Sequence, residues 1–174
     1  MDQTAINIQN DIAALLPRLR RFGRAVTRHR EDADDLVQIA VERALSRAEQ
    51  WEAGTRLDSW LFRIMKNAWI DEVRGRIRRS EVLAPEEAGE HIGADPSDGY
   101  VHQLAVQKAV SMLNEDQRMV VSLVLIEGLP YKEAAEVLEI PIGTLTSRLV
   151  RARETLQGLL SDPSGSSKPA GSVS

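Results

Sequence analysis

The segment 128–153, GLPYKEAAEVLEIPIGTLTSRLVRAR, constrains the fold of this 174-residue chain more than any other stretch. It begins with a short helical pattern around Ala134 and Ala135, and a turn follows because Pro141 and Gly143 interrupt the periodicity. A second helix is then predicted from apolar residues at i, i+4, i+7 and i+11, which are Leu145, Leu149, Ala152 and Leu156. Two helices joined by so tight a turn predict a helix-turn-helix.

The outward face of the second helix indicates what it binds. We expect Thr144 to cap the N-terminus of this helix. The side chains that then point outward are Thr146, Ser147, Val150, Arg151 and Glu154, with Arg148 and Arg153 on the flanks of this face. In the major groove such side chains reach base edges, thymine methyl groups and phosphates. An αα-hairpin with solvated arginines is the alternative, but the Ala-Ala helix, the Pro-x-Gly-Thr turn and the basic face together favour DNA recognition.

Composition indicates an all-α protein that is not an enzyme. Hydrophobic residues make up 43% of the chain, enough for packed cores, and alternating β-branched runs are almost absent. The chain has no cysteine, and His29, His91 and His102 lack ligand spacing, so we expect no disulfide, no metal and no other cofactor. No nucleophile–base pair or phosphate loop is evident, so no catalytic residue is predicted. The lack of a long apolar run or a leader-like N-terminus predicts a cytoplasmic protein with no membrane insertion.

Three helices are predicted in the first 79 residues. The first, over 4–30, contains Pro17, which predicts a kink or two shorter helices, and its arginines are interpreted as mostly solvated. The second, over 31–48, is outwardly polar except for Ile39, and an apolar residue there suggests a partner surface. Its buried face has the most regular apolar spacing in the chain and consists of Ala33, Leu36, Val37, Ala40, Val41, Ala44 and Leu45.

The third helix, over 57–74, carries a basic stripe beside its apolar side. The stripe consists of Arg63, Lys66, Asn67, Ile70 and Arg74. All the tryptophans lie in or near this helix: Trp60 is interpreted as core, whereas Trp51 and Trp69 are predicted to be available for stacking on bases. Cations near aromatic rings are typical of surfaces that bind single-stranded nucleic acid, and this interpretation is slightly favoured. The alternative is a helix whose basic side chains are simply solvated.

The segment 80–99 separates two helical regions. It contains six acidic and no basic residues together with two prolines and three glycines, so it is predicted to be a flexible linker. Helices over 100–113 and 116–127 follow, the second with Asn114 as its N-cap. The Ser-, Gly- and Pro-rich tail 161–174 is predicted to be disordered.

In their order and spacing, three stretches resemble an extracytoplasmic-function (ECF, group IV) RNA polymerase sigma factor. They are DADDLVQIAVERAL (32–45), GTRLDSWLFRIMKNAWIDEVR (54–74) and the segment 113–153, which contains the helix-turn-helix. The resemblance implies a sigma region 2 domain over 4–79, an acidic linker over 80–100 and a sigma region 4 domain over 101–160. The stretch RLDSWLFRIMKN is similar to the branch that serves general stress responses in alphaproteobacteria.

The resemblance also implies partners and the residues that bind them. The protein is expected to bind core RNA polymerase, through the clamp helices of the largest subunit and the flap of the second-largest subunit, and to direct it to a subset of promoters. Binding to the clamp helices is implied for Asp35, Gln38, Ile39 and Glu42. Contact with minus-ten promoter DNA is implied for Trp51, Arg56, Arg63, Lys66, Asn67 and Arg74. Contact with the minus-thirty-five element is implied for Thr144, Thr146, Ser147, Arg148, Val150 and Arg151.

The resemblance further implies regulation by an anti-sigma factor that contacts the face containing Ile39. Two alternative functions remain open. One is a sigma-like decoy that sequesters an anti-sigma factor without starting transcription, although a decoy usually lacks DNA-contacting residues such as Arg63, Lys66 and Asn67. The other is a stand-alone helix-turn-helix regulator, which leaves the segment 31–79 unexplained.

Overall fold

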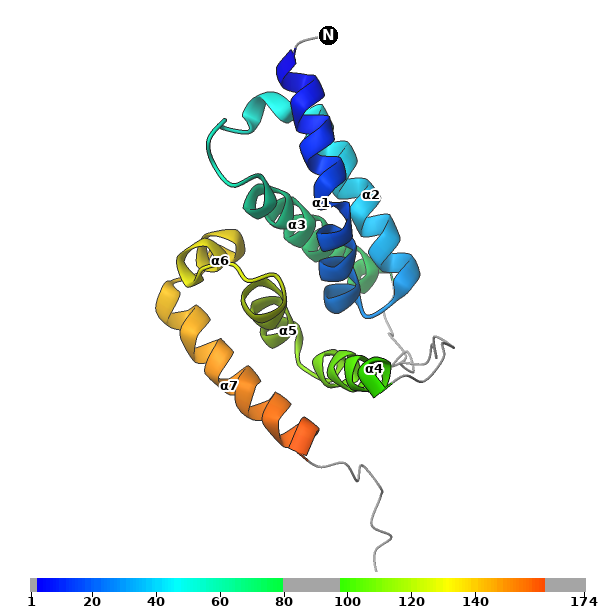
Figure 1. Ribbon diagram of the computed structural model, residues 1–174, viewed down its shortest axis with the longest axis vertical. Coiled ribbons are helices and arrows are strands. Elements are labelled where there is room, and N and C mark those ends of the chain that lie inside the picture. Colours follow the sequence, from blue (N-terminus) through cyan, green and yellow to red (C-terminus); the bar gives the residue numbers. More distant parts are fainter. Residues whose placement is uncertain (1–2, 80–97, 162–174) are drawn as a thin grey trace, which may run out of the picture.

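The computed structural model describes residues 3–79 and 98–161, and within them the chain is helical with no strand. This confirms the all-α fold. The N-terminal unit (3–79) consists of α1 (Gln3–Thr27), α2 (Arg30–Ser46), the short 3-10 helix η1 (Ala48–Gln50) and α3 (Leu57–Arg79). The C-terminal unit (98–161) lies beside it (Figure 1). The predicted linker and tail fall largely in 80–97 and 162–174, outside the described residues.

The core of the N-terminal unit forms where α1 packs on both α2 and α3 (Figure 1). Phe22 of α1 is fully buried, and its ring centre lies 4.9 Å from that of Phe62 of α3. Gly23 allows α1 and α2 to approach closely, since a Cβ at this position would meet the Ala33 carbonyl oxygen at 3.3 Å. Aromatic contact on one side of α1 and close backbone approach on the other therefore fix the three helices together.

Two details of α1 and α2 differ from the predictions. Helix α1 runs unbroken through Pro17, so the alternative of two shorter helices was wrong, and Ile12 and Leu19 on either side of the proline are both buried. On α2 the predicted stripe is buried except for Val41, which is half-buried, and Leu45, which is 40% exposed. Leu45 lies in the last turn, at the edge of the face that meets α1 and α3. Ile39 is exposed, as predicted.

The C-terminal unit packs α4, α5 and α6 against the long helix α7. Its elements are α4 (Asp98–Ser111), α5 (Glu115–Val121), one turn of π-helix η2 (Ser122–Ile126), α6 (Tyr131–Leu138) and α7 (Ile142–Ser161). The Asn114 side chain accepts a hydrogen bond from the Gln117 backbone N–H at 2.8 Å, which confirms Asn114 as the N-cap of α5. Leu145, Leu149 and Ala152 of α7 are buried, as the periodicity predicts.

Helices α6 and α7 form the helix-turn-helix (yellow to orange in Figure 1). Helix α6 ends at Leu138, and the next residue, Glu139, takes the left-handed conformation with φ 55°. Helix α7 begins at Ile142, so Thr144 lies inside its first turn and the prediction of Thr144 as N-cap was wrong. The helix starts earlier because the Pro141 carbonyl oxygen already accepts the Leu145 N–H, at 3.1 Å.

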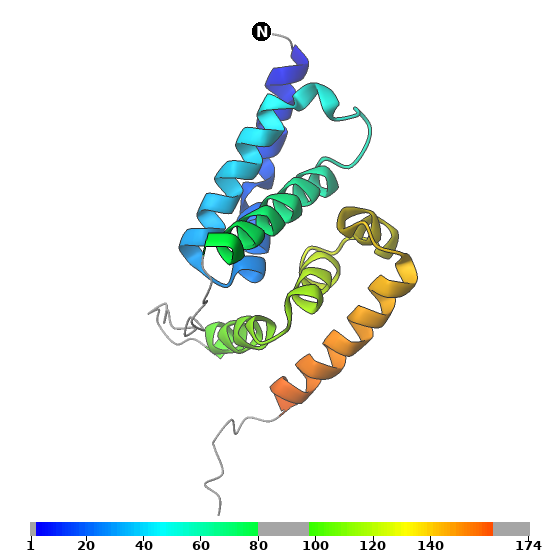
Figure 2. The same ribbon diagram turned by 180° about the vertical axis from the view of Figure 1, so that it is seen from behind.

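The two units lie against each other in both views (Figures 1 and 2). Helix α6 contacts α3, whereas α5 and η2 contact α1. Helix α3 and the helix-turn-helix, for which DNA binding was predicted separately, therefore share an interface. None of the helices within 3–79 and 98–161 combines the length and apolarity that a bilayer crossing requires.

Candidate nucleic-acid and partner interfaces

The outward face of α7 has the chemistry of a DNA-reading helix. Ser147, Val150 and Arg151 are exposed, and Val150 is 49% exposed although it is apolar. The hydroxyls of Thr146 and Ser147 donate to carbonyl oxygens in the first turn of α7, at 2.8 and 3.3 Å. Each hydroxyl therefore keeps lone pairs for an outside donor, such as the amino group of a base.

The remaining two residues predicted for the minus-thirty-five element are less free. Thr144 is half-buried. Nη2 of Arg148 lies 3.4 Å from Oδ2 of Asp116 on α5, so this arginine is held toward its own unit. Arg151 has no ion pair within the described residues and extends from the exposed face of α7.

The basic stripe of α3 partly lies against α6 rather than facing solvent. Nη2 of Arg63 donates to the Glu136 carbonyl oxygen at 3.0 Å, and Nζ of Lys66 lies 3.2 Å from Oε2 of Glu139. Lys66 is only 5% exposed. Two cations predicted to hold minus-ten DNA thus contact α6 or the residue that follows it, although Arg63 stays exposed and only Lys66 is buried.

The other end of the stripe faces a cleft between the units. Asn67 and Arg74 are exposed. Arg74 and Lys66 line this cleft of about 290 Å³ together with Arg148 of α7, and Leu138 and Met119 contribute apolar surface. The structure therefore brings residues predicted for the two promoter elements into one cleft.

The three tryptophans differ in their access to solvent. Trp51 and Trp60 are half-buried against the core, and Nε1 of Trp51 is buried without a hydrogen-bond partner within the described residues. Trp69 is 7% exposed, and the guanidinium of Arg76 lies 5.6 Å from its ring centre. The prediction that Trp69 could stack on bases was wrong, because α3 turns this ring into the core.

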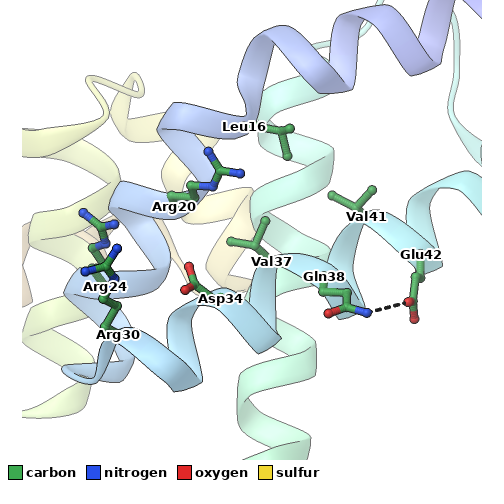
Figure 3. Close-up of a pocket in the computed structure, with 9 residues that line it drawn as sticks. All are labelled: Leu16, Arg20, Arg24, Arg30, Asp34, Val37, Gln38, Val41 and Glu42. Carbon is green, nitrogen blue, oxygen red and sulfur yellow. Dashed lines mark hydrogen bonds between the residues drawn. The ribbon is translucent and has the colours of Figure 1, made fainter.

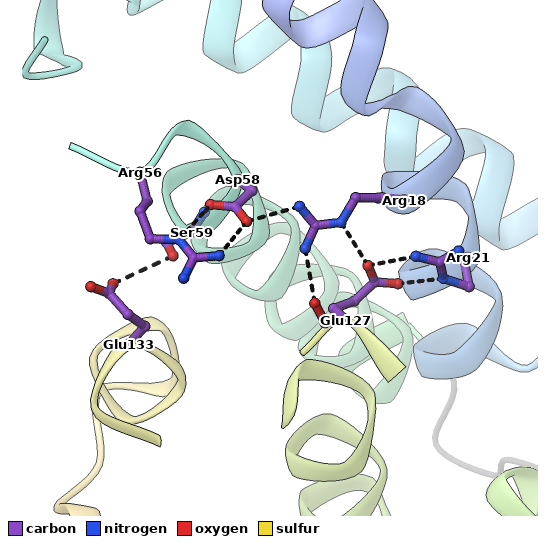
Figure 4. A network of polar contacts seen from close by, with 7 residues as sticks. All are labelled: Arg18, Arg21, Arg56, Asp58, Ser59, Glu127 and Glu133. Carbon is purple, nitrogen blue, oxygen red and sulfur yellow. Dashed lines mark hydrogen bonds and ion pairs between the residues drawn. The ribbon is translucent and has the colours of Figure 1, made fainter. Parts of the chain in front are cut away.

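An ion network joins α1, α3 and the residue that follows η2 (Figure 4). The side chain of Glu127 is fully enclosed and accepts hydrogen bonds from Nε of Arg18 at 3.0 Å and from Nε and Nη2 of Arg21 at 2.7 and 2.9 Å. Arg18 also donates to the Glu127 carbonyl oxygen at 3.1 Å and to Oδ2 of Asp58 at 2.9 Å. One glutamate of the C-terminal unit is therefore held by two arginines of the N-terminal unit.

Asp58, in the first turn of α3, is the anionic centre on the N-terminal side of this network. Burial by itself raises the pKa of the Asp58 carboxyl, but hydrogen bonds from Arg56, from Arg18 and from the Ser59 backbone N–H outweigh it and lower the pKa from 3.8 to about 2. Arg56, a residue predicted for minus-ten DNA, donates to both oxygens of Asp58 at 3.1 and 2.8 Å. The carboxylate therefore orients this arginine at the end of the loop.

The residues predicted to bind polymerase share one face of α2. Asp35, Gln38, Ile39 and Glu42 are all exposed. Nε2 of Gln38 donates to Oε1 of Glu42 at 3.2 Å, which places the two side chains along the same edge (Figure 3). An apolar side chain among carboxylates and an amide fits a partner helix that carries apolar and basic residues.

Gln38 and Glu42 also border a groove of about 540 Å³ between α1 and α2 (Figure 3). Its apolar lining comes from Leu16, Val37 and Val41. Its α1 side and one end carry Arg20, Arg24 and Arg30, which are exposed and have no ion pair within the described residues. An apolar lining with a basic rim fits an amphipathic segment of a protein partner.

Sequence reasoning missed the residues that join the two units. The arginines of α1 were predicted to be mostly solvated, yet Arg18 and Arg21 bind Glu127, 109 and 106 residues away. The available signals were weak: Arg18 and Arg21 lie three residues apart at the edge of an apolar stripe, and Glu127 ends the apolar run SLVLIE. Neither signal identifies the partner.

A three-helix unit followed by a unit that ends in a helix-turn-helix defines a class of two-domain, DNA-reading helical proteins. Comparison with known families agrees. Residues 12–66 match the family described as the Sigma2 domain of PhyR, and residues 103–156 match Sigma-70, region 4.

The chain belongs to the ECF sigma factor family. It is 32% identical over 154 residues to the ECF RNA polymerase sigma factor EcfG of Rhodopseudomonas palustris, covering 88% of this chain and 85% of EcfG. It is 31% identical over 144 residues to the ECF RNA polymerase sigma factor SigW of Bacillus subtilis, covering 75% of this chain and 76% of SigW.

Solved structures agree with this membership. The sigma factor RpoE of Bartonella quintana, in complex with the anti-sigma factor NepR, matches with a TM-score of 0.78 and 31% identity, covering 90% of this chain and 98% of RpoE. A PhyR–NepR complex from Sphingomonas sp. Fr1 shares the fold, with a TM-score of 0.63 and 18% identity over 95% of each chain. The matches to EcfG and RpoE support the alphaproteobacterial stress-type branch that the sequence resembles.

Proposed function

We propose that this chain binds core RNA polymerase and directs it to a specific subset of promoters in a stress response. The observation that carries the proposal is the outward face of α7, where Ser147, Val150 and Arg151 are exposed at the start of the second helix of a helix-turn-helix. This helix reads the minus-thirty-five element in the major groove. Val150 meets a thymine methyl group, Ser147 a base edge, and Arg151 guanine or phosphate.

The minus-ten element is bound as single-stranded DNA by α3 and the loop before it. Asn67 and Arg74 are exposed, and the half-buried ring of Trp51 supports a role in stacking on an unpaired base. Base–aromatic stacking contributes about 1–3 kcal/mol per base, which offsets the cost of taking a base out of the duplex. Arg63 and Lys66 join this surface once α6 has moved away.

Protein partners bind the N-terminal unit. The face of α2 that carries Asp35, Gln38, Ile39 and Glu42 docks on the clamp helices of the polymerase. The arginine-rimmed groove beside it takes an amphipathic helix of an anti-sigma factor, whose acidic edge pairs with Arg20 and Arg24. Because Gln38 and Glu42 border both surfaces, the two partners compete, and the anti-sigma factor keeps the protein from polymerase.

A run-off transcription assay with bacterial core polymerase, the full chain and a pool of genomic fragments tests this function. Defined transcripts that depend on the protein are expected. A decoy that sequesters an anti-sigma factor is the second candidate. The match of residues 12–66 to the Sigma2 domain of PhyR favours it, because PhyR forms a complex with NepR, the anti-sigma factor that also binds RpoE. A folded protein that binds an anti-sigma factor but neither polymerase nor promoter DNA would establish the decoy instead.

A further inference from the structure

The carboxylate of Asp58 has all of its hydrogen-bonding capacity in use. Its Oδ1 accepts from Nε of Arg56 at 3.1 Å and from the Ser59 backbone N–H at 2.8 Å. Its Oδ2 accepts from Nη2 of Arg56 at 2.8 Å and from Nη1 of Arg18 at 2.9 Å. Because an ionised carboxylate offers about four lone-pair sites, this one has none left and cannot rotate without breaking a bond.

Two of these four bonds hold Asp58 independently of Arg56. One comes from the backbone of α3 at Ser59, and the other comes from Arg18 of α1, on the opposite side of the carboxylate from Arg56 (Figure 4). Arg18 is itself held in place, because its guanidinium lies 5.4 Å from the ring centre of the fully buried Phe62. The side chain of Arg56, in contrast, has no other hydrogen-bond partner within the described residues. Asp58 would therefore stay in place without Arg56, whereas Arg56 depends on Asp58.

Arg56 lies at the surface, at the end of the loop that precedes α3. Its side chain is 41% exposed, whereas that of Asp58 is 10% exposed. Asp58 accepts from Nε and from one N–H of Nη2, which leaves Nη1 and the second N–H of Nη2 available to an outside ligand. These remaining N–H groups lie at the end of the guanidinium and form a second fork. Such a fork fits two neighbouring acceptors, on a base edge or on a phosphate.

We propose that Asp58 is a positioning residue for minus-ten recognition, which holds Arg56 so that the second fork of this arginine meets the single strand. The inference rests on the proposed binding of minus-ten DNA by α3 and the loop before it. An arginine side chain has many rotamers. One that is fixed before the strand arrives loses less conformational entropy on binding. Asp58 acts through Arg56 and does not contact the DNA.

The sign of the effect distinguishes positioning from electrostatics. A carboxylate beside a DNA strand repels the phosphates, so electrostatics alone predicts that removal of the Asp58 charge tightens binding. Positioning predicts weaker binding, because Arg56 without Asp58 samples many orientations. A purely structural role for Asp58 is distinguished by Arg56 itself, because a structural effect would persist after Arg56 is replaced.

The test combines Asp58→Asn and Arg56→Ala, singly and together, in a double-mutant cycle. Each full chain is assembled with a saturating amount of bacterial core polymerase. The probe is a fluorescein-labelled non-template strand of about 12 nucleotides, which is within the usual range of strand-binding sites. It is taken from the minus-ten region of a promoter that the run-off assay identifies. Fluorescence anisotropy measures its affinity, with core polymerase alone as the blank, and circular dichroism verifies the helix content of each chain.

Asp32→Asn is the matched control. The Asp32 carboxylate also accepts two hydrogen bonds from one arginine, from Nη2 and Nη1 of Arg76 at 2.7 and 3.1 Å. Neither of these residues belongs to the set predicted to contact DNA. Asp58→Glu provides a second variant should Asp58→Asn fail to fold, because it keeps the charge and displaces the carboxylate by one methylene group.

We expect Asp58→Asn and Asp58→Glu to weaken strand binding by about three- to tenfold and Asp32→Asn to leave it unchanged. In the Arg56→Ala chain, Asp58→Asn should cause no further loss. Unchanged or tighter binding by Asp58→Asn would overturn the inference, and so would a loss of equal size with and without Arg56.

Salt titrations identify the acceptor that Arg56 meets. If it is a phosphate, Arg56→Ala decreases the slope of log affinity against log salt by about 0.7, whereas the slope stays the same if it is a base edge. Either contact supports the inference. Run-off transcription by the unmodified chain separates the two possible failures. Transcripts that depend on the protein would show that the sigma activity stands even if Asp58 does not position Arg56, whereas no transcript at all would overturn both.

Discussion

Arg118 of α5 donates a hydrogen bond from Nε to the backbone carbonyl oxygen of Val26, 92 residues earlier in the chain, at 3.2 Å. Its Nη1 donates to the Leu113 carbonyl oxygen at 2.9 Å. Val26 lies in the last turn of α1 and Leu113 just beyond α4, so the guanidinium faces the negative ends of two helix dipoles. Burial, and then the positive charge of Arg28, lower the pKa of Arg118 to about 10. Arg118 therefore joins the two units without an ion pair among the described residues.

Replacing Arg118 with Met should lower the free energy of unfolding by about 1–3 kcal/mol, because two buried carbonyl oxygens lose their donor. Because methionine carries no charge that must be buried, part of this loss is offset. Urea unfolding followed by circular dichroism measures it. Arg20→Met is the control, since Arg20 is exposed, and it should leave the unfolding midpoint unchanged. Equal midpoints for the two variants would show that the Arg118 bonds do not stabilise the fold.

Replacing Asp58 with Asn should destabilise the protein at pH 7 by about 2 kcal/mol, the value of a pKa lowered from 3.8 to about 2. Since the folded-state pKa is below the unfolded one, the stabilisation is fully present above about pH 4 and is lost as pH falls through about 2. The free energies of unfolding of the parent and the variant, measured by urea unfolding across this range, should therefore converge as the pH falls.

Asp71→Asn is the control for this measurement, because Asp71 forms only an exposed ion pair. Its Oδ2 lies 3.8 Å from Nη1 of Arg43. It should have little effect at any pH. A difference between the parent and Asp58→Asn that stays constant from pH 7 to about 2 would contradict the lowered pKa of Asp58.

Replacing Ile39 with Asp should weaken binding to core polymerase by about tenfold or more, because a carboxylate would be buried at an apolar contact. Biolayer interferometry with immobilised core polymerase measures the change. Leu160→Asp places the same charge on an exposed apolar site near the end of α7 and should leave affinity unchanged. If both variants bind as tightly as the parent, the α2 face is not the docking surface.

Replacing Arg151 with Ala should weaken binding to promoter duplexes that carry the native minus-thirty-five element. If Arg151 contacts a base, the loss is about 1–3 kcal/mol and is specific for that base pair. If it contacts a phosphate, affinity falls for all sequences and the slope of log affinity against log salt decreases by about one. Titrations at several salt concentrations distinguish the two contacts.

Arg153→Ala is the matched control, since Arg153 is also exposed on α7 but lies beside the buried face that contains Ala152. It should bind the promoter duplex like the parent. Transcription that is equal from promoters with and without the native element, for both the parent and Arg151→Ala, would remove the assigned role of α7.

Local spacing allowed most of the helices to be predicted, because it repeats within each element. The buried residues of α2 and α7, the N-cap at Asn114 and the two helices of the helix-turn-helix all follow from patterns within about 15 residues. The N-cap of α7 was misplaced by three residues, since Pro141 accepts the first helical bond and Thr144 was predicted to do so. Boundaries of this kind depend on backbone geometry that residue types only partly specify.

The sequence by itself determined the helical class, the outward face of α7 and the exposed position of Ile39, because each depends on the period of a single helix. Only the tertiary structure decided that Lys66 is buried under α6, that Trp69 lies in the core and that Glu127 binds Arg18 and Arg21. These features depend on which helical faces meet. The sequence does not show whether a charged side chain is solvated or paired with a residue more than 100 positions away.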